Sequence, residues 1–327
     1  KLSWIELPSI SSFQREGGSL EVLMRTVKAV VATAGSSPAR LASCVTGLCI
    51  TVSSVIGSIL SSTLVDDLLL TVVLIFIVTA VYLQTDWPVA MVEWYNPEVV
   101  FRMPTKKRLA ALTIDDVPLL DSPTHFEQIL DVLKVHDVKA TFFIMSGFSL
   151  PPAQGGMEAE RAAHCKKLLQ RAVDEGHELG NHLQFDRPAF ALTCEEFDEA
   201  FRHCDALIAS VSGGEEAWRK RRHRWFRPSS GLWTDHIMAT ASKAGYKTVL
   251  GNCFPHDVAA VSRHFNPTYL KYRVRPGAVI VVHDRWHTPK TLQAALPAVL
   301  RGGMSLGTLS SVSDAVDSSM PSEHKRD

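Results

Sequence analysis

The hydrophobic and polar positions between residues 108 and 300 follow two patterns that alternate along the chain. Short runs of apolar and β-branched residues are separated by longer stretches in which apolar residues recur every three or four positions. This alternation predicts an α/β fold of repeated β–α units, with the functional site at the carboxyl ends of parallel strands. The expected strands cover residues 108–113, 139–144, 177–181, 225–227, 248–251 and 278–282, and the expected helices cover 124–136, 158–175, 193–210, 234–244 and 289–300.

A different pattern precedes this region. Residues 41–85 contain only two charged residues, Asp66 and Asp67. The stretch 68–85 is apolar without an amphipathic period, and at 1.5 Å per residue its length approaches the ~30 Å of a bilayer core. We therefore expect a membrane-anchoring helix there, with a buried core helix as the alternative. The stretch 41–65 is richer in Ser, Thr and Gly, and fits either a second span of a hairpin or a flexible stem.

The rest of the chain divides by composition. Residues 1–40 form an N-terminal segment, 86–107 read as a proline-containing linker, 108–315 as the main α/β domain, and 316–327 as a disordered tail. Lys plus Arg and Asp plus Glu both total 34, so no charge excess indicates a nucleic-acid partner. The six cysteines show no spacing typical of a metal site. Oligomeric state and the side of the membrane stay open.

Two adjacent carboxylates follow the first expected strand. Asp115 and Asp116 come after an apolar run and before Val117 and a proline. This places both acids at the mouth of a buried strand, where α/β and barrel enzymes carry their chemistry. One carboxylate can hold a metal ion while its neighbour moves a proton. Adjacent acids are also common in surface turns, so the pair alone does not decide between the two interpretations.

Acids, bases and cations also follow the later strands. Three of these residues, Asp116, His182 and Asp186, can supply metal ligands and leave positions open for water and substrate. His182 and Asp186 are four residues apart, so a tight loop could aim both at one ion. Each has a structural alternative, because a strand-end histidine is often merely hydrogen-bonded and an aspartate can cap a turn. The joint pattern favours a hydrolytic metal site.

The remaining candidates fit proton transfer. Asp115 can act as a general base on water, and His283 can act as a general acid from the far side of the mouth. Arg227 can keep the base ionised, with a structural ion pair as the alternative. A backbone N–H near Ser230 can help to hold an oxyanion.

The short sequence blocks that contain these residues resemble, in order and spacing, those of the polysaccharide deacetylase family. This family is the family-four carbohydrate esterases, which include chitin deacetylases. The resemblance extends from about residue 108 to 312. The matching blocks are 112–118, 177–182, 226–231, the acid Asp257, and 280–284. It implies a distorted (β/α) barrel with fewer than eight strands.

The resemblance also implies an activity, the metal-dependent removal of an N- or O-acetyl group from a sugar. By position it makes Asp115 the base, Asp116 and His182 metal ligands, and His283 an acid that Asp257 supports.

Three residues depart from the family's pattern. Asp186 stands where the family usually has a second histidine ligand; we expect Zn²⁺, but the added oxygen ligand favours harder ions. Val117 stands where glycine is usual, and a β-branched residue would be strained if φ were positive there. Val258 replaces a tryptophan after Asp257.

We therefore expect a membrane-anchored, metal-dependent hydrolase that removes acetyl groups from an N-acetylated sugar polymer or glycoconjugate by cleaving a carbon–nitrogen bond that is not a peptide bond. One alternative is a membrane-tethered member that binds glycans without turnover, and another is an amide hydrolase of a different substrate class. The basic run 219–224 fits either a contact with anionic lipid or an acidic polymer, or a solvated loop.

Overall fold

The structure is a computed structural model that describes residues 64–82, 84–120, 123–258 and 264–318. The expected segment 1–40, all but the last two residues of the expected stretch 41–65, and the end of the expected tail lie outside these ranges. The chain divides into two compact units, Lys1–Tyr82 and Leu83–Asp327.

In the first unit, helix α4 covers Leu64–Tyr82 and includes most of the stretch that we expected to span a membrane. Within the described ranges, no helix combines the length and the apolar character that crossing a bilayer requires. The expectation of a spanning helix at 68–85, and of a membrane anchor built on it, is therefore not supported.

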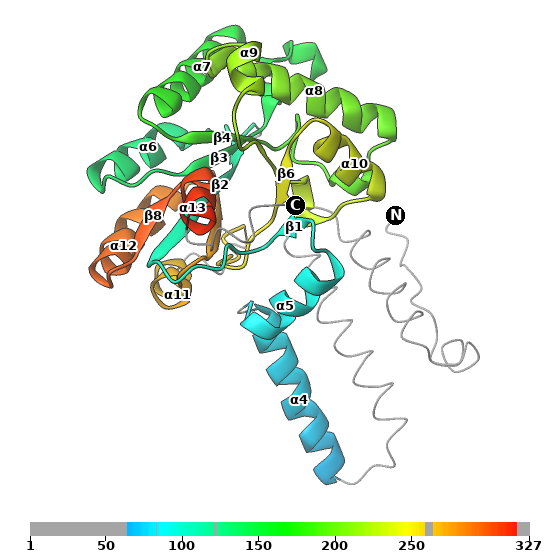
Figure 1. The fold of residues 1–327 in the computed structure, drawn as a ribbon, viewed down its shortest axis with the longest axis vertical. Coiled ribbons are helices and arrows are strands. Elements are labelled where there is room, and N and C mark those ends of the chain that lie inside the picture. Colours follow the sequence, from blue (N-terminus) through cyan, green and yellow to red (C-terminus); the bar gives the residue numbers. More distant parts are fainter. Residues whose placement is uncertain (1–63, 83, 121–122, 259–263, 319–327) are drawn as a thin grey trace, which may run out of the picture. The chain divides into compact units, whose positions relative to one another are not determined.

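The second unit is built on one sheet whose strands all run parallel (Figure 1). Its main path follows the order β1-β6-β5-β4-β3-β2-β7, and the short strand β8 pairs with the start of β2. The expected distorted (β/α) barrel is confirmed, with seven strands on this path and β8 beside it. The strands are β1 (Val99–Val100), β2 (Leu109–Val117), β3 (Thr141–Ile144), β4 (Glu178–Asn181), β5 (Trp225–Phe226), β6 (Lys247–Val249), β7 (Val279–His283) and β8 (Ser305–Gly307).

Helices connect successive strands and surround the sheet (Figure 1). Their apolar faces match the periods read from the sequence, and Thr193 and Glu196 form a capping box at the start of α8, which satisfies backbone N–H groups of its first turn. The helices of this unit are α5 (Asp86–Tyr95), α6 (Phe126–Val135), α7 (Ala159–Asp174), α8 (Cys194–Val211), α9 (Glu215–Arg219), α10 (Asp235–Lys243), α11 (Asn266–Arg273), α12 (Thr288–Arg301) and α13 (Leu309–Asp317).

The side chains of β2 alternate between two hydrophobic clusters. Ala110, Leu112 and Ile114 belong to the large cluster that the sheet forms with its surrounding helices. Ala111 instead belongs to a smaller cluster with inward-facing residues of other strands, such as Phe143. Because successive strand residues point to opposite faces, the odd-numbered positions of β2 from Leu109 to Asp115 face the barrel interior.

Two isolated bridges narrow the gap between the edge strands. Cys253, just after β6, pairs with Ile280 of β7, and Arg102, just after β1, pairs with Ala278. At the other end of the interior, Ser310 at the start of α13 donates its backbone N–H to Glu178 at 3.2 Å. The barrel is therefore closed by irregular segments and by α13 as well as by regular strand pairing.

The expected domain boundaries differ from the observed elements. The segment 86–107, expected to be a linker, contains α5 and the edge strand β1, which pairs with β6. At the other end, α13 continues past residue 315 to Asp317. Barrel elements therefore extend beyond 108–315 on both sides.

Candidate active site

Asp115 and Asp116 lie in a β-bulge near the end of β2. The pairing of β2 with β3 shifts between Ile114 and Val117, so two residues of β2 oppose one residue of β3. Asp116 has φ 59°, in the left-handed region that residues other than glycine rarely adopt. Strict alternation would send Asp116 to the helix side, and the bulge instead directs both carboxylates to the mouth of the barrel.

The condition under which Val117 would be strained, a positive φ, is not met. The left-handed residue of this turn is Asp116, and Val117 does not have a positive φ. Val117 is fully buried in the cluster between sheet and helices. A β-branched residue is therefore compatible with the backbone at this position.

Arg227 holds Asp115 inside the barrel. Its Nη1 atom donates to Asp115 Oδ1 at 2.5 Å and to Thr113 Oγ1 at 2.8 Å. Its Nε atom donates to the carbonyl of Val249 at 3.2 Å, and the guanidinium lies 4.1 Å above the ring of Phe143. Burial lowers the pKa of Arg227, and the charge of Asp115 partly offsets this effect. The pair fixes Asp115 with one oxygen engaged.

His182 and Asp116 face each other across a short gap. His182 Nδ1 lies 2.7 Å from the carbonyl oxygen of Arg227, which can only accept, so Nδ1 carries a proton. The other ring atom, Nε2, lies 3.4 Å from Asp116 Oδ1. Ligand imidazoles are commonly oriented by such a hydrogen bond to a backbone carbonyl. His182 therefore directs its free nitrogen at a carboxylate.

The electrostatics at this gap favour a cation. Burial favours the neutral imidazole, but the hydrogen bond to Asp116 and the charges of Asp115 and Asp116 outweigh it and raise the pKa of His182. Burial likewise favours a neutral Asp116, but His182, His283 and Arg285 together hold the pKa of Asp116 well below its usual range. Two ligand atoms of one tetrahedral zinc lie about 3.4 Å apart, given bonds of about 2.0–2.1 Å. These two residues therefore fit a divalent metal ion.

Asp186, the third expected ligand, does not lie as close to Asp116 and His182 as a complete set of three metal ligands would require. Within the described residues, the ligand atoms of Asp116, His182 and Asp186 do not all lie within 4.8 Å of one another. Asp186 as a whole residue is exposed, but protein atoms partly shield its carboxyl group from water. This desolvation, together with the charge of Asp116, raises the pKa of Asp186. Asp186 therefore borders the site, and its role as a ligand stays a prediction.

Asp257 pairs with His283, the residue that the resemblance makes the acid. His283 Nδ1 lies 2.8 Å from Asp257 Oδ1, and both side chains are largely buried. Burial favours the neutral ring, but the charge and hydrogen bond of Asp257, with Asp116 and Asp115 behind them, raise the pKa of His283 to about 9. His283 can therefore carry a proton at neutral pH.

Arg285 is a site residue that the sequence analysis missed. Its Nη2 atom donates to Asp116 Oδ2 at 2.7 Å, and its Nη1 atom donates to the carbonyl of Asp284 at 3.0 Å. The signal available in the sequence was its place two residues after His283. Arg285 therefore binds Oδ2 of Asp116, whereas His182 faces Oδ1.

Asp284 has a structural role at the same mouth. Its side chain is fully buried and accepts hydrogen bonds from the N–H groups of Leu119 at 3.0 Å and His125 at 2.8 Å. Its own N–H donates to the carbonyl of Asp115 at 2.9 Å. Asp284 thus links the segment after β2 to the end of β7.

Ser230 lies in the turn η4 (Ser229–Gly231), which follows Arg227 closely in the chain. It is exposed and has φ 71°. Ser229 Oγ donates to the carbonyl of His182 at 3.3 Å, so this turn adjoins the metal-ligand candidate. The expected part of Ser230 in holding an oxyanion stays a prediction.

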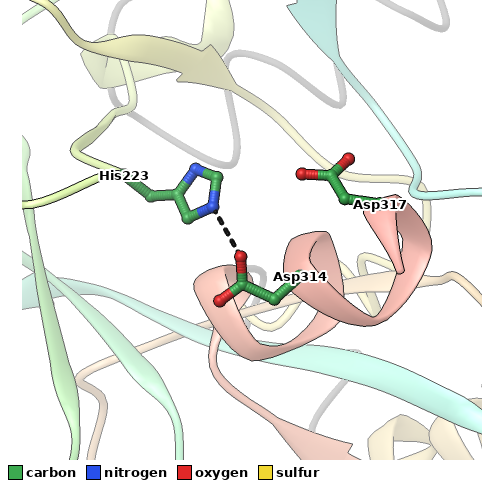
Figure 2. A group of neighbouring side chains, drawn as sticks. All are labelled: His223, Asp314 and Asp317. Carbon is green, nitrogen blue, oxygen red and sulfur yellow. Dashed lines mark hydrogen bonds and ion pairs between the residues drawn. The ribbon is translucent and has the colours of Figure 1, made fainter. Parts of the chain in front are cut away.

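A second group of ligand-type side chains lies outside these strand ends (Figure 2). His223, Asp314 and Asp317 place their ligand atoms within 4.8 Å of one another. Arg222 already donates to Asp314 at 2.6 Å and to Asp317 at 2.7 Å, so both carboxylates have a cation. The cluster fastens α13 to the basic run 219–224, which supports the interpretation of that run as a solvated, ion-paired surface.

Comparisons with known proteins identify the family. The sequence profile described as polysaccharide deacetylase matches residues 102–249. A peptidoglycan-N-acetylglucosamine deacetylase of Bacillus cereus is 26% identical over 220 residues, which are 65% of this chain and 91% of that protein. A chitooligosaccharide deacetylase of Sinorhizobium fredii is 30% identical over 173 residues, which are 53% of this chain and 70% of that protein.

Solved structures share the fold. A peptidoglycan N-acetylglucosamine deacetylase matches with a TM-score of 0.56 and 23% identity, over 67% of this chain and 95% of that one. A pseudoenzyme of carbohydrate esterase family four from Bacillus anthracis matches with a TM-score of 0.52 and 22% identity, over 66% of this chain and 69% of that one. The chain belongs to the polysaccharide deacetylase family, which includes deacetylases that hydrolyse carbon–nitrogen bonds other than peptide bonds.

Proposed function

We propose that this protein is a metal-dependent deacetylase that removes acetyl groups from an N-acetylated sugar polymer or glycoconjugate. The observation that carries the proposal is the position of two paired proton-transfer groups beside one candidate metal pair. Asp115 is held by Arg227 at 2.5 Å, and His283 is held by Asp257 at 2.8 Å. Asp116 faces His182 at 3.4 Å, and the charge of His283 acts on Asp116 to lower its pKa.

The first proton transfer falls to Asp115. Arg227 binds one of its oxygens, which leaves the other to accept a proton from the attacking water. Because Arg227 is itself fixed by Thr113 and by two backbone carbonyls, Asp115 needs no reorganisation before it acts. Water then adds to the acetyl carbonyl carbon and forms a tetrahedral oxyanion.

The second proton transfer falls to His283. Its Nδ1 atom is engaged by Asp257, so Nε2 is the atom that can donate a proton. Transfer of this proton to the amide nitrogen lets the carbon–nitrogen bond break, which yields acetate and a free amine on the sugar. A backbone N–H near Ser230 would help to stabilise the oxyanion before this step.

Asp116 and His182 would hold the metal ion, with Asp186 as the third ligand. A divalent cation there would polarise the acetyl carbonyl and lower the pKa of water. The mixture of one imidazole with two carboxylates supports Zn²⁺ and also allows harder transition ions.

The substrate class rests on the relatives. One is named for peptidoglycan N-acetylglucosamine and the other for chitooligosaccharide, and both are named deacetylases. A sugar that carries an acetamide group is the element common to these names. We therefore propose a polymer or glycoconjugate with N-acetylated sugars as the substrate.

The test is acetate release by the purified full-length chain, loaded with Zn²⁺ or Co²⁺, from chitooligosaccharides and from peptidoglycan. Asp115→Asn and His283→Gln should each lower kcat by about 10²–10⁴-fold, the usual contribution of a positioned acid or base. Asp198→Asn alters a carboxylate that pairs with His236 at a partly exposed position and should leave acetate release unchanged. Equal rates for all four proteins would remove the proposal.

A second candidate is a protein that binds glycans without turnover. Two observations favour it: Arg285 already pairs with Asp116, and the ligand atoms of the three expected ligands do not all lie within 4.8 Å of one another. The metal content of the purified chain after incubation with Zn²⁺ separates the two candidates. One ion per chain favours the enzyme, and the absence of bound metal favours the binding protein.

A further inference from the structure

Large apolar side chains are exposed at three neighbouring strand ends of the barrel. Leu232 follows β5 in the chain, Val258 follows β6 and Trp286 follows β7. Strand β6 pairs with β5, and Cys253 just after β6 bridges to β7, so these three strands are neighbours around the barrel. Because parallel strands bring their carboxyl ends to one edge, the three side chains belong to one arc of the rim.

The same three loops carry candidate residues of the active site. In order around the barrel, Leu232 follows Ser230, Val258 follows Asp257, and Trp286 follows His283, each within three positions. Isolated exposed apolar residues are common on protein surfaces, so one of them alone would carry no meaning. Three at neighbouring strand ends, each beside an active-site candidate, are typical of a ligand-binding surface.

The turn that carries Trp286 is fixed by hydrogen bonds to the active site. The N–H of Thr288 donates to the carbonyl of Arg285 at 2.9 Å and closes the turn. Thr288 Oγ1 donates to the carbonyl of His283 at 2.6 Å, and Arg285 Nη2 donates to Asp116 Oδ2 at 2.7 Å. The turn is therefore ordered before a ligand binds to Trp286, which lowers the entropic cost of binding.

The indole of Trp286 is nevertheless presented to solvent. The residue is 56% exposed, although an indole gains much free energy when it is buried. Its ring meets that of His287 at 81°, with centroids 5.3 Å apart, so His287 leaves at least one face of the indole uncovered. The three residues from His283 to Trp286 span at most about 11 Å. A rigid, open aromatic face thus lies close to the group that would donate the proton.

We infer that Trp286 is a stacking platform for a sugar next to the one that is deacetylated, so that the substrate is an oligomer or polymer of sugars. The position of the reacting sugar rests on the proposed function. A pyranose ring has apolar C–H faces and a polar rim of hydroxyl groups. The electron-rich face of the indole attracts the C–H groups, and the charged residues that follow β2 and β4 suit the polar rim. Leu232 and Val258 extend the apolar surface around the barrel mouth.

The platform is testable without any turnover. The experiment is isothermal titration calorimetry of the full-length chain in the presence of a chelator, with chitotetraose and with a tetrasaccharide from peptidoglycan as the ligands. The parent chain should bind at least one of them. Trp286→Ala should raise the Kd of the bound tetrasaccharide about tenfold, because it removes a ring-stacking contact. Trp286→Tyr keeps an aromatic ring and should retain most of the affinity.

Tyr272→Ala is the matched control. Tyr272 is 67% exposed, but it lies within helix α11 and not at the end of a strand. Tyr272→Ala should bind the tetrasaccharide as the parent chain does. Trp286→Ala should unfold within about 2 °C of the parent chain, because an exposed turn residue contributes little to stability. Unchanged binding by Trp286→Ala, an equal loss in Tyr272→Ala, or no binding of either tetrasaccharide by the parent chain would overturn the inference.

Acetate release by the metal-loaded chain separates binding from chemistry. Trp286→Ala should raise KM for the tetrasaccharide about tenfold with little change in kcat, because Trp286 takes no part in proton transfer. The parent chain should prefer the tetrasaccharide to a single N-acetylglucosamine, and Trp286→Ala should lose most of this preference. A preference that Trp286→Ala keeps in full would overturn the inference. Binding that depends on Trp286, without acetate release by the parent chain, would refute the proposed function and leave the platform intact.

Discussion

Asp257 binds His283 twice, through the ring and through the backbone. Its Oδ1 atom lies 2.8 Å from His283 Nδ1, and its Oδ2 atom accepts the backbone N–H of His283 at 2.8 Å. One carboxylate thus sets both the orientation and the charge of the imidazole. Burial lowers the pKa of His283, but the charge and side-chain hydrogen bond of Asp257, with the charges of Asp116 and Asp115, raise it to about 9.

Asp257→Asn should move the basic limb of the pH–rate profile to lower pH. The acid form of His283 is active, so activity falls as the pH rises through the pKa of His283. Removing the charge of Asp257 leaves the effect of burial, which lowers this pKa, and the limb should move down by about one to three pH units. The measurement is kcat for acetate release from pH 5 to 10.

Asp198→Asn is the control for this prediction. Asp198 pairs with His236 at 2.9 Å, in the same His–Asp arrangement but at side chains 41% and 37% exposed. Its profile should match that of the parent chain. A basic limb that stays in place in Asp257→Asn would show that His283 is not the acid.

Arg227→Met should destabilise the barrel, since it leaves Asp115 buried without its cation. Breaking one side of a buried ion pair typically costs about 3–5 kcal/mol, and the combined change Arg227→Met with Asp115→Asn should regain part of this. Urea unfolding at pH 7 measures both. Arg222→Met removes an exposed ion-pairing arginine and should cost about 1 kcal/mol or less. Equal costs for the two single variants would contradict the prediction.

The long elements could be predicted from the sequence because their signals are local. Helix α8 has an apolar face and a capping box within its own residues. Strand β7 is a continuous apolar run. Strand β1 has only two residues, in a segment that reads as a linker, and it exists because it pairs with β6 more than 140 residues later in the chain. The equally short β5 was predicted because it falls between two expected helices, whereas the proline-containing segment around β1 gives no such context.

The candidate site likewise has a part that local sequence signals predict and a part that depends on pairing between distant segments. The identities of Asp115, Asp116, His182 and His283 could be read from the strand ends, since parallel strands bring their carboxyl ends to one edge. The bulge that turns Asp116 could not, because it is a property of the pairing between β2 and β3. Arg285 was missed for a related reason, since its partner Asp116 lies 169 positions away.

Metal retention should depend on Asp116 and His182 and not on the cluster in Figure 2. Asp116→Ala and His182→Ala each remove one of the two atoms that face each other at 3.4 Å, and both should lose bound Zn²⁺ and acetate release together. His223→Ala should retain one ion per chain, because Arg222 already neutralises Asp314 and Asp317. Metal lost from His223→Ala and kept in His182→Ala would reverse the assignment of the two sites.

His177 should make the fold less stable in mild acid. Burial, helped by the charge of Lys139, lowers the pKa of His177 from its ordinary value of 6.5 to about 4. Its Nδ1 atom accepts the backbone N–H of Ala140 at 3.1 Å, which the charged ring could not do. As the pH falls from about 7 toward 4, His177 therefore becomes protonated in the unfolded chain but stays neutral in the folded chain. This difference lowers the free energy of unfolding by about 3 kcal/mol.

His177→Gln should remove this dependence, because the amide oxygen of glutamine can still accept the N–H of Ala140 but does not titrate. Urea unfolding at pH 7, 6, 5 and 4.5 should give a flatter stability curve for His177→Gln than for the parent chain. His164→Gln changes a histidine whose side chain is 55% exposed, and its curve should follow that of the parent. Parallel curves for His177→Gln and the parent would mean that the acid sensitivity arises at other groups, since a buried neutral histidine must contribute a slope between its two pKa values.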